Sequence, residues 1–238
     1  MMQGSEKLKK LTTWSLLCEG ISRRGRFHPP SNHPMKFLRN NGLSLVLACL
    51  FLIFWGCQAW SGWHVNNDDL QLHGRHTLGF LEYLDSGHFW QATGENWESE
   101  FLQMGAYVIL TCFLFQKGSA ESKDPDDPDK EGATDDRKMG LLYRNSLSLA
   151  FVVLFALSFT LHASGGLCQE NAERSENHLP PETMGEFLTG SQFWFQSFQN
   201  WQSEFLAVLS IVTLSIFLRQ HGSPESKAID DPNSKTGK

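Results

Sequence analysis

Charged residues are almost absent from four long stretches of this sequence. The blocks 43–60, 97–115, 147–163 and 201–218 contain no Lys, Arg or Asp, and Glu occurs only near the start of the second and fourth. As helices rising about 1.5 Å per residue, blocks of this length cross one hydrocarbon core. Buried helices of a soluble domain are the alternative, but such helices normally keep a polar face. The lack of charge therefore predicts an all-α integral membrane protein with four transmembrane helices.

Motifs for catalysis and metal binding are also missing. The five cysteines form no CxxC pair and no zinc spacing, and there is no phosphate-binding glycine loop, nucleophile elbow or HExxH motif. His73 and His76 lie three apart in a polar loop, which is typical of solvated histidines. We therefore predict no enzyme activity, catalytic residue, cofactor or metal site. Whether Cys57 and Cys168, near the outer ends of two blocks, form a disulfide stays open.

The chain also repeats itself at an offset of 104 residues. Between 97–123 and 201–227, 15 of 27 positions are identical, and "NWESEFL" at 96–102 returns as "NWQSEFL" at 200–206. Each copy holds two apolar blocks, so both copies enter and leave the membrane on the same side. This pattern predicts two parallel two-helix repeats.

The repeat predicts the division of the chain. The expected segments are a basic N-terminal extension at 1–34, repeat 1 at 35–123, an acidic linker at 124–140, repeat 2 at 141–227 and a disordered tail at 228–238. The extension is expected to be disordered or to precede the true start at Met35, and a basic arm on the membrane surface is the alternative. The repeated block 147–163 is internal, so we interpret 43–60 as a permanent span and not as a signal peptide.

Basic residues predict the orientation. The stretches 61–100 and 164–204 hold 2 basic residues in total, whereas 12 lie near the other ends of the blocks. Cytoplasmic loops carry the excess of Lys and Arg, so both termini are expected in the cytoplasm. Tryptophans gather at the outer ends, where indole prefers the headgroup layer. The expected interfacial anchors are Trp60, Trp63, Trp90, Trp97, Trp194 and Trp201.

Aromatic residues before the second and fourth blocks recur at roughly four-residue steps. This spacing predicts short amphipathic helices that lie on the outer surface and then turn into the membrane. At the opposite ends of the same two blocks, Gly118 and Gly222 are expected to cap the helices.

Two interpretations fit the glutamates at the outer boundary. If Asn96 and Asn200 cap helix starts, the glutamates that follow lie in the first turn, where unpaired backbone N–H groups favour negative charge. Alternatively Glu100 and Glu204, matched at the repeat offset, join a second matched pair in a ring around a vestibule. That pair is Gln58 and His162.

The phrases "FLRNNGLSLV", "NWESEFLQM" and "FLFQKGSAESKDPD" carry a resemblance to an uncharacterised family of small bacterial four-span membrane proteins, over about residues 36–232. The resemblance implies a bacterial inner membrane and no assigned activity. We expect a non-enzymatic interaction, scaffold or envelope protein. A small transporter or channel with Glu100 and Glu204 at its mouth is the alternative, and an enzyme at the outer face is the least supported. The expected partner is the lipid bilayer, with a protein partner or homo-oligomer left open and nucleic acid excluded.

Overall fold

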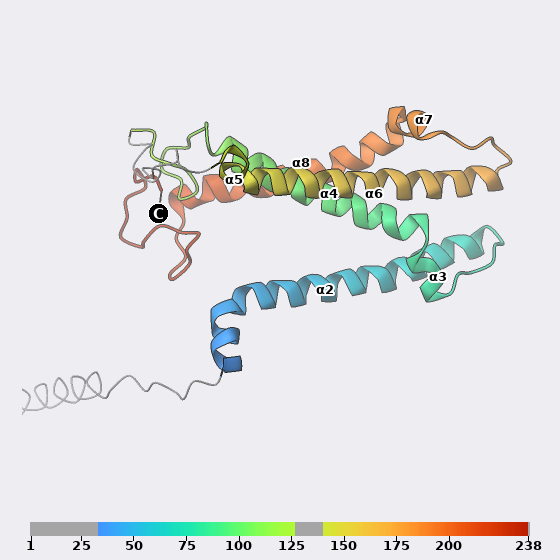
Figure 1. The fold of residues 1–238 in the computed structure, drawn as a ribbon, viewed down its shortest axis with the longest axis horizontal. Helices are drawn as coiled ribbons and strands as arrows, with labels where there is room; N and C mark the ends of the chain where they lie inside the picture. Colours follow the sequence, from blue (N-terminus) through green and yellow to red (C-terminus); the bar gives the residue numbers. More distant parts are fainter. Residues whose placement is uncertain (1–32, 127–139, 238) are drawn as a thin grey trace, which may run out of the picture. The chain divides into compact units, whose positions relative to one another are not determined.

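The computed structural model describes residues 33–126 and 140–237, and within those ranges every regular element is a helix (Figure 1). This confirms the all-α prediction. The chain divides into one unit that ends at Gly56 and a second that comprises Cys57–Lys238. The extension at 1–32 and most of the acidic linker lie outside the described residues.

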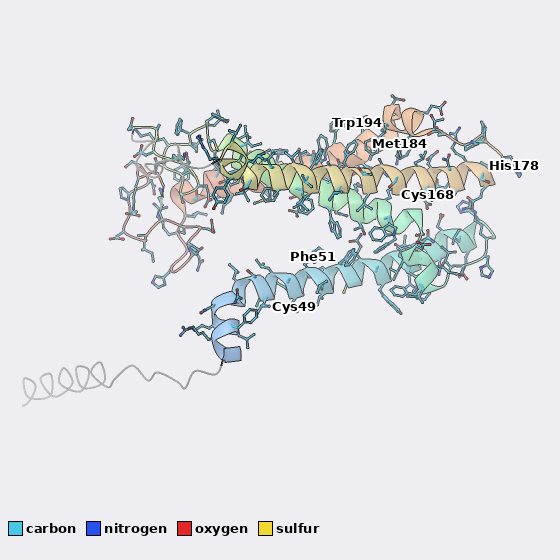
Figure 2. The ribbon with its side chains drawn as sticks, in the orientation of Figure 1. Cys49, Phe51, Cys168, His178, Met184 and Trp194 are labelled. Atoms are coloured by element: carbon cyan, nitrogen blue, oxygen red, sulfur yellow. The ribbon has the colours of Figure 1, made fainter. Side chains whose placement is uncertain are left out.

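Helix α2 (His33–Leu72) passes from the first unit into the second. In its apolar block the side chains of Leu43, Leu47 and Phe54 are all exposed, and Cys49 and Phe51 are labelled on this helix in Figure 2. The helix continues about three turns past the predicted boundary at residue 60, because nothing in that stretch breaks a helix before Gly74, which has a positive φ of 69°.

Helix α4 (Gly87–Leu110) differs most from the prediction. It begins ten residues before the predicted span and continues straight through the stretch assigned to a separate interfacial helix. The N-cap is Ser86, whose Oγ accepts a hydrogen bond from the backbone N–H of Phe89 at 3.3 Å. The same correction applies to α8 (Ser191–Phe217). The predicted turn into the membrane is therefore wrong, since the four-residue aromatic spacing belongs to the long helix itself.

Three helices are long and apolar enough to cross a membrane, namely α2, α6 (Ser146–Glu176) and α8, whereas four transmembrane helices were predicted. Helix α4, which contains the second predicted span, does not meet this standard of length and apolarity. It ends at Leu110, five residues before the predicted boundary, and it buries Thr93, Glu98, Ser99 and Gln103. These polar side chains lower its hydropathy, but they face its neighbours. In the second unit α4 packs antiparallel to α6 and parallel to α8 (Figure 1).

Two short helices, α3 (Phe80–Leu84) and α7 (Met184–Thr189), follow loops after α2 and α6. Asn67 and Asn171 each exchange two hydrogen bonds with the backbone of one loop residue, Leu78 and Glu182 respectively, at 2.7–3.0 Å. Glu82 and Glu186 then accept from the backbone N–H three residues earlier. Each residue of the first set has its counterpart in the second 104 residues later, so the local structure recurs at the offset of the sequence repeat. We call the end formed by the loops 73–79 and 177–183 with α3 and α7 the tryptophan-rich end.

The opposite end is built from the turns at 116–126 and 219–237. Lys227, only 2% exposed, donates through Nζ to the backbone oxygens of Gly118 (2.5 Å), Lys235 (3.0 Å), Asn233 (3.2 Å) and Ile216 (3.4 Å). Lys227 therefore links Asn233 and Lys235 of the C-terminal segment to Gly118 and to the end of α8. The polar composition of this segment gave no sign that its backbone oxygens accept hydrogen bonds from a buried ammonium group.

Helix α4 ends at Leu110 and α8 at Phe217, so neither predicted glycine cap closes its helix. Gly118 and Gly222 instead lie in the turns beyond, with positive φ angles of 85° and 78°. The two glycines indicated a positive φ angle at these positions, but the sequence did not show that both helices end several residues earlier.

The distribution of polarity is inverted relative to a soluble domain. Among the described residues thirteen polar or charged side chains are buried, against seven apolar ones, while Leu, Ile, Val and Phe side chains of α2, α6 and α8 are exposed. Soluble folds bury their large apolar residues first. The surface is therefore compatible with a lipid solvent and the interior with specific polar packing.

Candidate functional site

The centre of the site is a carboxyl–imidazole pair between two helices. Glu98 on α4 and His162 on α6 are both 0% exposed, and Oε2 of Glu98 lies 2.9 Å from Nδ1 of His162. Burying a carboxylate costs several kcal/mol unless a partner compensates it. The pair supplies that partner within hydrogen-bonding distance.

Helix α8 supplies further hydrogen-bonding partners to the pair. The indole N–H of Trp201 donates to Oε1 of Glu98 at 3.0 Å, and Nε2 of His162 faces Oε1 of Gln196 at 3.4 Å. That same oxygen of Gln196 accepts a hydrogen bond from Nε2 of Gln91 on α4 at 3.0 Å. Each helix therefore contributes at least one member, and the five side chains form one connected network.

Aromatic rings shield the network. Phe193 stacks on the ring of His162 with 4.6 Å between centroids and 24° between planes. Phe159 and Phe187 pack edge-on against Phe193. An imidazole between an aromatic face and a carboxylate is held in one orientation, which restricts the direction of its hydrogen bonds.

Glycines bring the backbones of α4 and α6 together at this level. A Cβ atom built on Gly94 would lie within 3 Å of the His162 backbone, and one on Gly165 would lie 2.5 Å from the backbone nitrogen of Gln91. Small residues permit such close approach between membrane helices. Since neither glycine belongs to a GxxxG motif, this crossing had no recognisable signal in the sequence.

A cavity of about 280 Å³ adjoins the network at the tryptophan-rich end. Gln91 and Gln196, both members of the network, form part of its wall. The remaining polar lining includes Glu95, Glu170, Glu173, Gln192 and His88. The described lining carries three carboxylates and neither lysine nor arginine, so the cavity favours cationic over anionic solutes.

The four matched polar residues predicted from the repeat do not form a ring. Only His162 enters the network, and its carboxylate partner is Glu98. Glu100 is exposed, while Glu204 and Gln58 are half-buried. No hydrogen bond joins the side chains of the four to one another in the described part of the chain. The sequence signal favoured Glu100 because it recurs as Glu204, whereas Glu98 is replaced by Gln202 at the repeat offset and was passed over.

The first-turn explanation of the glutamates is also wrong. Asn96 and Asn200 lie inside helices. Asn96 donates to the backbone oxygen of Ala92 at 2.7 Å, and Asn200 donates to the carboxylate Oε1 of Glu95 at 2.5 Å. Neither α4 nor α8 carries an acidic residue in its first turn. The dipeptide Asn-Trp resembled a cap only because the helix start had been placed too late.

Three predicted anchors use their indole N–H inside the protein. Trp63 donates to the backbone oxygen of Leu78 and Trp194 to that of Leu188, while Trp201 binds Glu98. Trp60 is 57% exposed, and its ring packs at a tilt against that of its neighbour Trp63. The remaining two predicted anchors, Trp90 and Trp97, lie on α4. Figure 2 labels Trp194, at the start of α8, together with His178 and Met184.

Cys57 and Cys168 are free thiols, so they form no disulfide in this structure. Within residues 33–126 and 140–237, no group of three or more acidic, histidine or cysteine side chains is arranged to hold a metal ion.

The sequence model of one family matches residues 34–238. The chain belongs to DUF6766, a domain of unknown function. Comparison with curated proteins and with solved structures found no match. Membership in DUF6766 agrees with the resemblance to an uncharacterised family, and the match covers the network, the cavity and the Lys227 turn.

Proposed function

We propose that this chain is a non-enzymatic, multi-pass protein of the bacterial inner membrane. The observation that carries the proposal is the inverted polarity of its helices, with exposed apolar side chains on α2, α6 and α8 and buried polar ones between helices. Lipid is the solvent for which such a surface is stable. The expected partners are the bilayer itself and either a second protein or another copy of the chain.

Helix α4 is the fourth crossing in this proposal, although it is too polar to qualify alone. It runs alongside α6 and α8, so its polar side chains meet protein and not lipid. The recurrence of loop hydrogen bonds at an offset of 104 residues supports two related hairpins. Two hairpins return the chain to its starting side, in agreement with 12 basic residues near one side and 2 near the other.

Cysteine labelling of intact cells tests this topology. His178→Cys and His221→Cys are introduced separately into a chain whose native cysteines are replaced by serine. A membrane-impermeant maleimide should label the first variant and not the second. Labelling of His221→Cys, or recovery of the chain in the soluble fraction without detergent, would contradict the proposal.

Transport of a proton or small cation is the second candidate function. The observation that favours it is the cavity beside the Glu98–His162 pair, since buried carboxylates at membrane depth often mark ion pathways. The carboxylate in question is then Glu98, in place of Glu100 and Glu204.

Flux in proteoliposomes separates the two functions. If the chain transports, Glu98→Gln should lower cation-driven or proton-driven dye responses at least tenfold, and the exposed Glu100→Gln should leave them unchanged. Loss of flux in Glu100→Gln plus Glu204→Gln would instead support the mouth predicted from the sequence. Absence of flux in the wild-type chain would remove transport and leave the non-enzymatic interaction role.

A further inference from the structure

We propose that the Glu98–His162 pair is a proton-binding site whose occupancy sets the wall of the adjoining cavity. The inference depends on the geometry of the pair alone, and it holds whether or not the protein transports a solute.

The first step is a count of hydrogen atoms at His162. Nδ1 faces a carboxylate oxygen of Glu98 at 2.9 Å, and Nε2 faces the amide oxygen of Gln196 at 3.4 Å. Both partners are acceptors, and only the doubly protonated imidazolium donates from both nitrogens. The oxygen of Gln196 also accepts a hydrogen bond from Nε2 of Gln91 at 3.0 Å, so His162 and Gln91 contact the same atom of this amide.

The second step is the release of one proton. When Nε2 of His162 gives its proton to water, the neutral ring still donates from Nδ1 to Glu98. Nε2 then presents a lone pair to the oxygen of Gln196, and two acceptors face one another. The charge of the pair changes from zero to −1, and the amide of Gln196 must turn to offer an N–H.

The third step links this rotation to the cavity. Turning Gln196 removes the oxygen that Gln91 binds, and both amides line the cavity wall. Proton release thus requires the amide of Gln91 to turn as well, and the hydrogen bond between α4 and α8 reverses its direction. Gln196 lies between the ring of His162 and the cavity, because its side chain contacts Nε2 and also forms part of the cavity wall.

Few other charges face the pair. Helix α4 contributes Glu98 and, further along the cavity, Glu95, both of which favour a protonated ring. Helix α8 contributes the uncharged side chains of Gln196 and Trp201. From α7, the uncharged ring of Phe187 packs against Phe193, which in turn stacks on His162. Among the described neighbours the two glutamates are therefore the electrostatic partners of His162.

The sequence carries uncharged residues at the two repeat-matched positions. At an offset of 104 residues Gln58 stands at the position of His162 and Gln202 at that of Glu98. Glu98→Gln combined with His162→Gln therefore introduces side chains that the sequence already uses at the equivalent places. This double variant provides a folded reference if a single variant, with one partner left unpaired, fails to fold.

Nitrogen-15 NMR of histidine side chains in the full chain, reconstituted in lipid nanodiscs, measures the protonation. The signal absent from His162→Gln belongs to His162. In a pH series from about 5 to 9, it should report two protonated ring nitrogens at the acid end and one, Nδ1, at the alkaline end. Glu98→Gln should weaken proton binding at His162 at least tenfold, while the matched Glu100→Gln should leave it unchanged.

A second readout follows the cavity wall. Gln192→Cys, in a chain with the native cysteines replaced by serine, should react with a small maleimide at a rate that changes with the protonation of His162. The double Gln variant should react at a rate that follows only the general pH dependence of a thiol.

Three results would overturn the proposal. They are a His162 ring that stays in one protonation state across this range, a titration that is the same in Glu98→Gln, and a maleimide rate of Gln192→Cys that ignores the His162 titration. None of them depends on a flux measurement, so failure of transport and failure of proton binding are distinguishable.

Discussion

At the scale of single residues, Gly94 is as decisive as the charged groups beside it. Its missing side chain lets α4 approach the backbone of His162, and this contact brings Glu98 within reach of the imidazole. A buried carboxylate without such a partner would be strongly destabilising. The smallest residue of the site thus determines whether its most polar residues are tolerated.

Gly94→Ala should destabilise the chain by about 1–3 kcal/mol, the usual cost of overpacking. The added Cβ would meet the backbone of His162, which cannot move as a flexible side chain does. The measurement is thermal unfolding in detergent. Gly56→Ala is the matched control, because a Cβ at Gly56 finds nothing within 4 Å. In that exposed helical position alanine should be neutral or mildly stabilising. Equal melting temperatures for the two variants would contradict the close contact.

Glu95→Gln should make the chain more stable at pH 7. The Glu95 side chain is half-buried in the wall of a cavity that holds two further carboxylates, Glu170 and Glu173, and this environment disfavours its negative charge in the folded state. Stability is therefore lost as the pH rises and the carboxyl ionises, whereas the neutral amide of glutamine does not ionise.

The measurement is the difference in melting temperature between Glu95→Gln and the wild type from pH 4 to pH 8. The gain should vanish near pH 4, where the wild-type carboxyl is protonated in both states. Glu100→Gln, on the exposed face of the same helix, should show no such pH-dependent gain. A Glu95→Gln variant less stable than the wild type at pH 7 would show that the charge is needed by Asn200.

At the scale of elements, hydropathy and packing give different answers for α4. A uniform apolar run identifies α2, α6 and α8 because lipid-facing helices need no polar contact. Helix α4 lies between α6 and α8, so its residues are selected for those neighbours, and Gln103 for example donates to the backbone oxygen of Glu204 at 3.2 Å. A polar helix with packed neighbours is stable where an isolated one would not be.

The turn around Lys227 is a second element that pattern reading missed. Lys227→Met should release the segment 228–237 from the ends of α4 and α8, since it removes a donor shared by four backbone oxygens. Unsatisfied buried acceptors cost about 1–3 kcal/mol, so protease cleavage of the tail should accelerate roughly tenfold or more.

Lys123 stands at the equivalent place of the first repeat and is half-buried. Lys123→Met removes the same charge and is the matched control. It should leave cleavage of the C-terminal tail unchanged. Equal protection of the tail in Lys227→Met and the wild type would mean that Arg219, which donates to the backbone oxygen of Asp231 at 3.0 Å, holds the segment alone.

At the scale of the whole molecule, the nature of the solvent governs what a surface substitution costs. Val153 on α6 is 57% exposed, and Leu179 in the loop after α6 is 50% exposed. In water, lysine at either position would be nearly neutral. In a bilayer, lysine near the middle of a span costs about 2.5–3.5 kcal/mol, whereas lysine in a loop remains cheap.

Val153→Lys should therefore lower the yield of membrane-integrated protein or its melting temperature in lipid nanodiscs, and Leu179→Lys should change neither. The two substitutions add the same charge to similarly exposed positions, so the pair isolates the surrounding solvent. Equal behaviour of both variants would contradict lipid as the solvent of α6.

The part of the fold that depends on local composition was predictable. Uncharged runs identified the helices of α2, α6 and α8, and a fixed offset identified matched loops such as those at Asn67 and Asn171. The predicted helix boundaries were wrong because residues that can cap a helix are common, and the N-cap of α4, Ser86, is one such residue among many. His162 was singled out because it matches Gln58 at the repeat offset, and the structure places Glu98 beside it.

The sequence by itself determined a helical chain with apolar runs suited to lipid and a repeat of 104 residues, because periodicity and the absence of charge are properties of neighbouring residues. Only the tertiary structure decided that Glu98 and not Glu100 meets His162, since that choice depends on which face of α4 the glycine at 94 turns toward α6. Two glutamates two residues apart have equal chemistry. Helical rotation places one of them in the interior and the other on the surface.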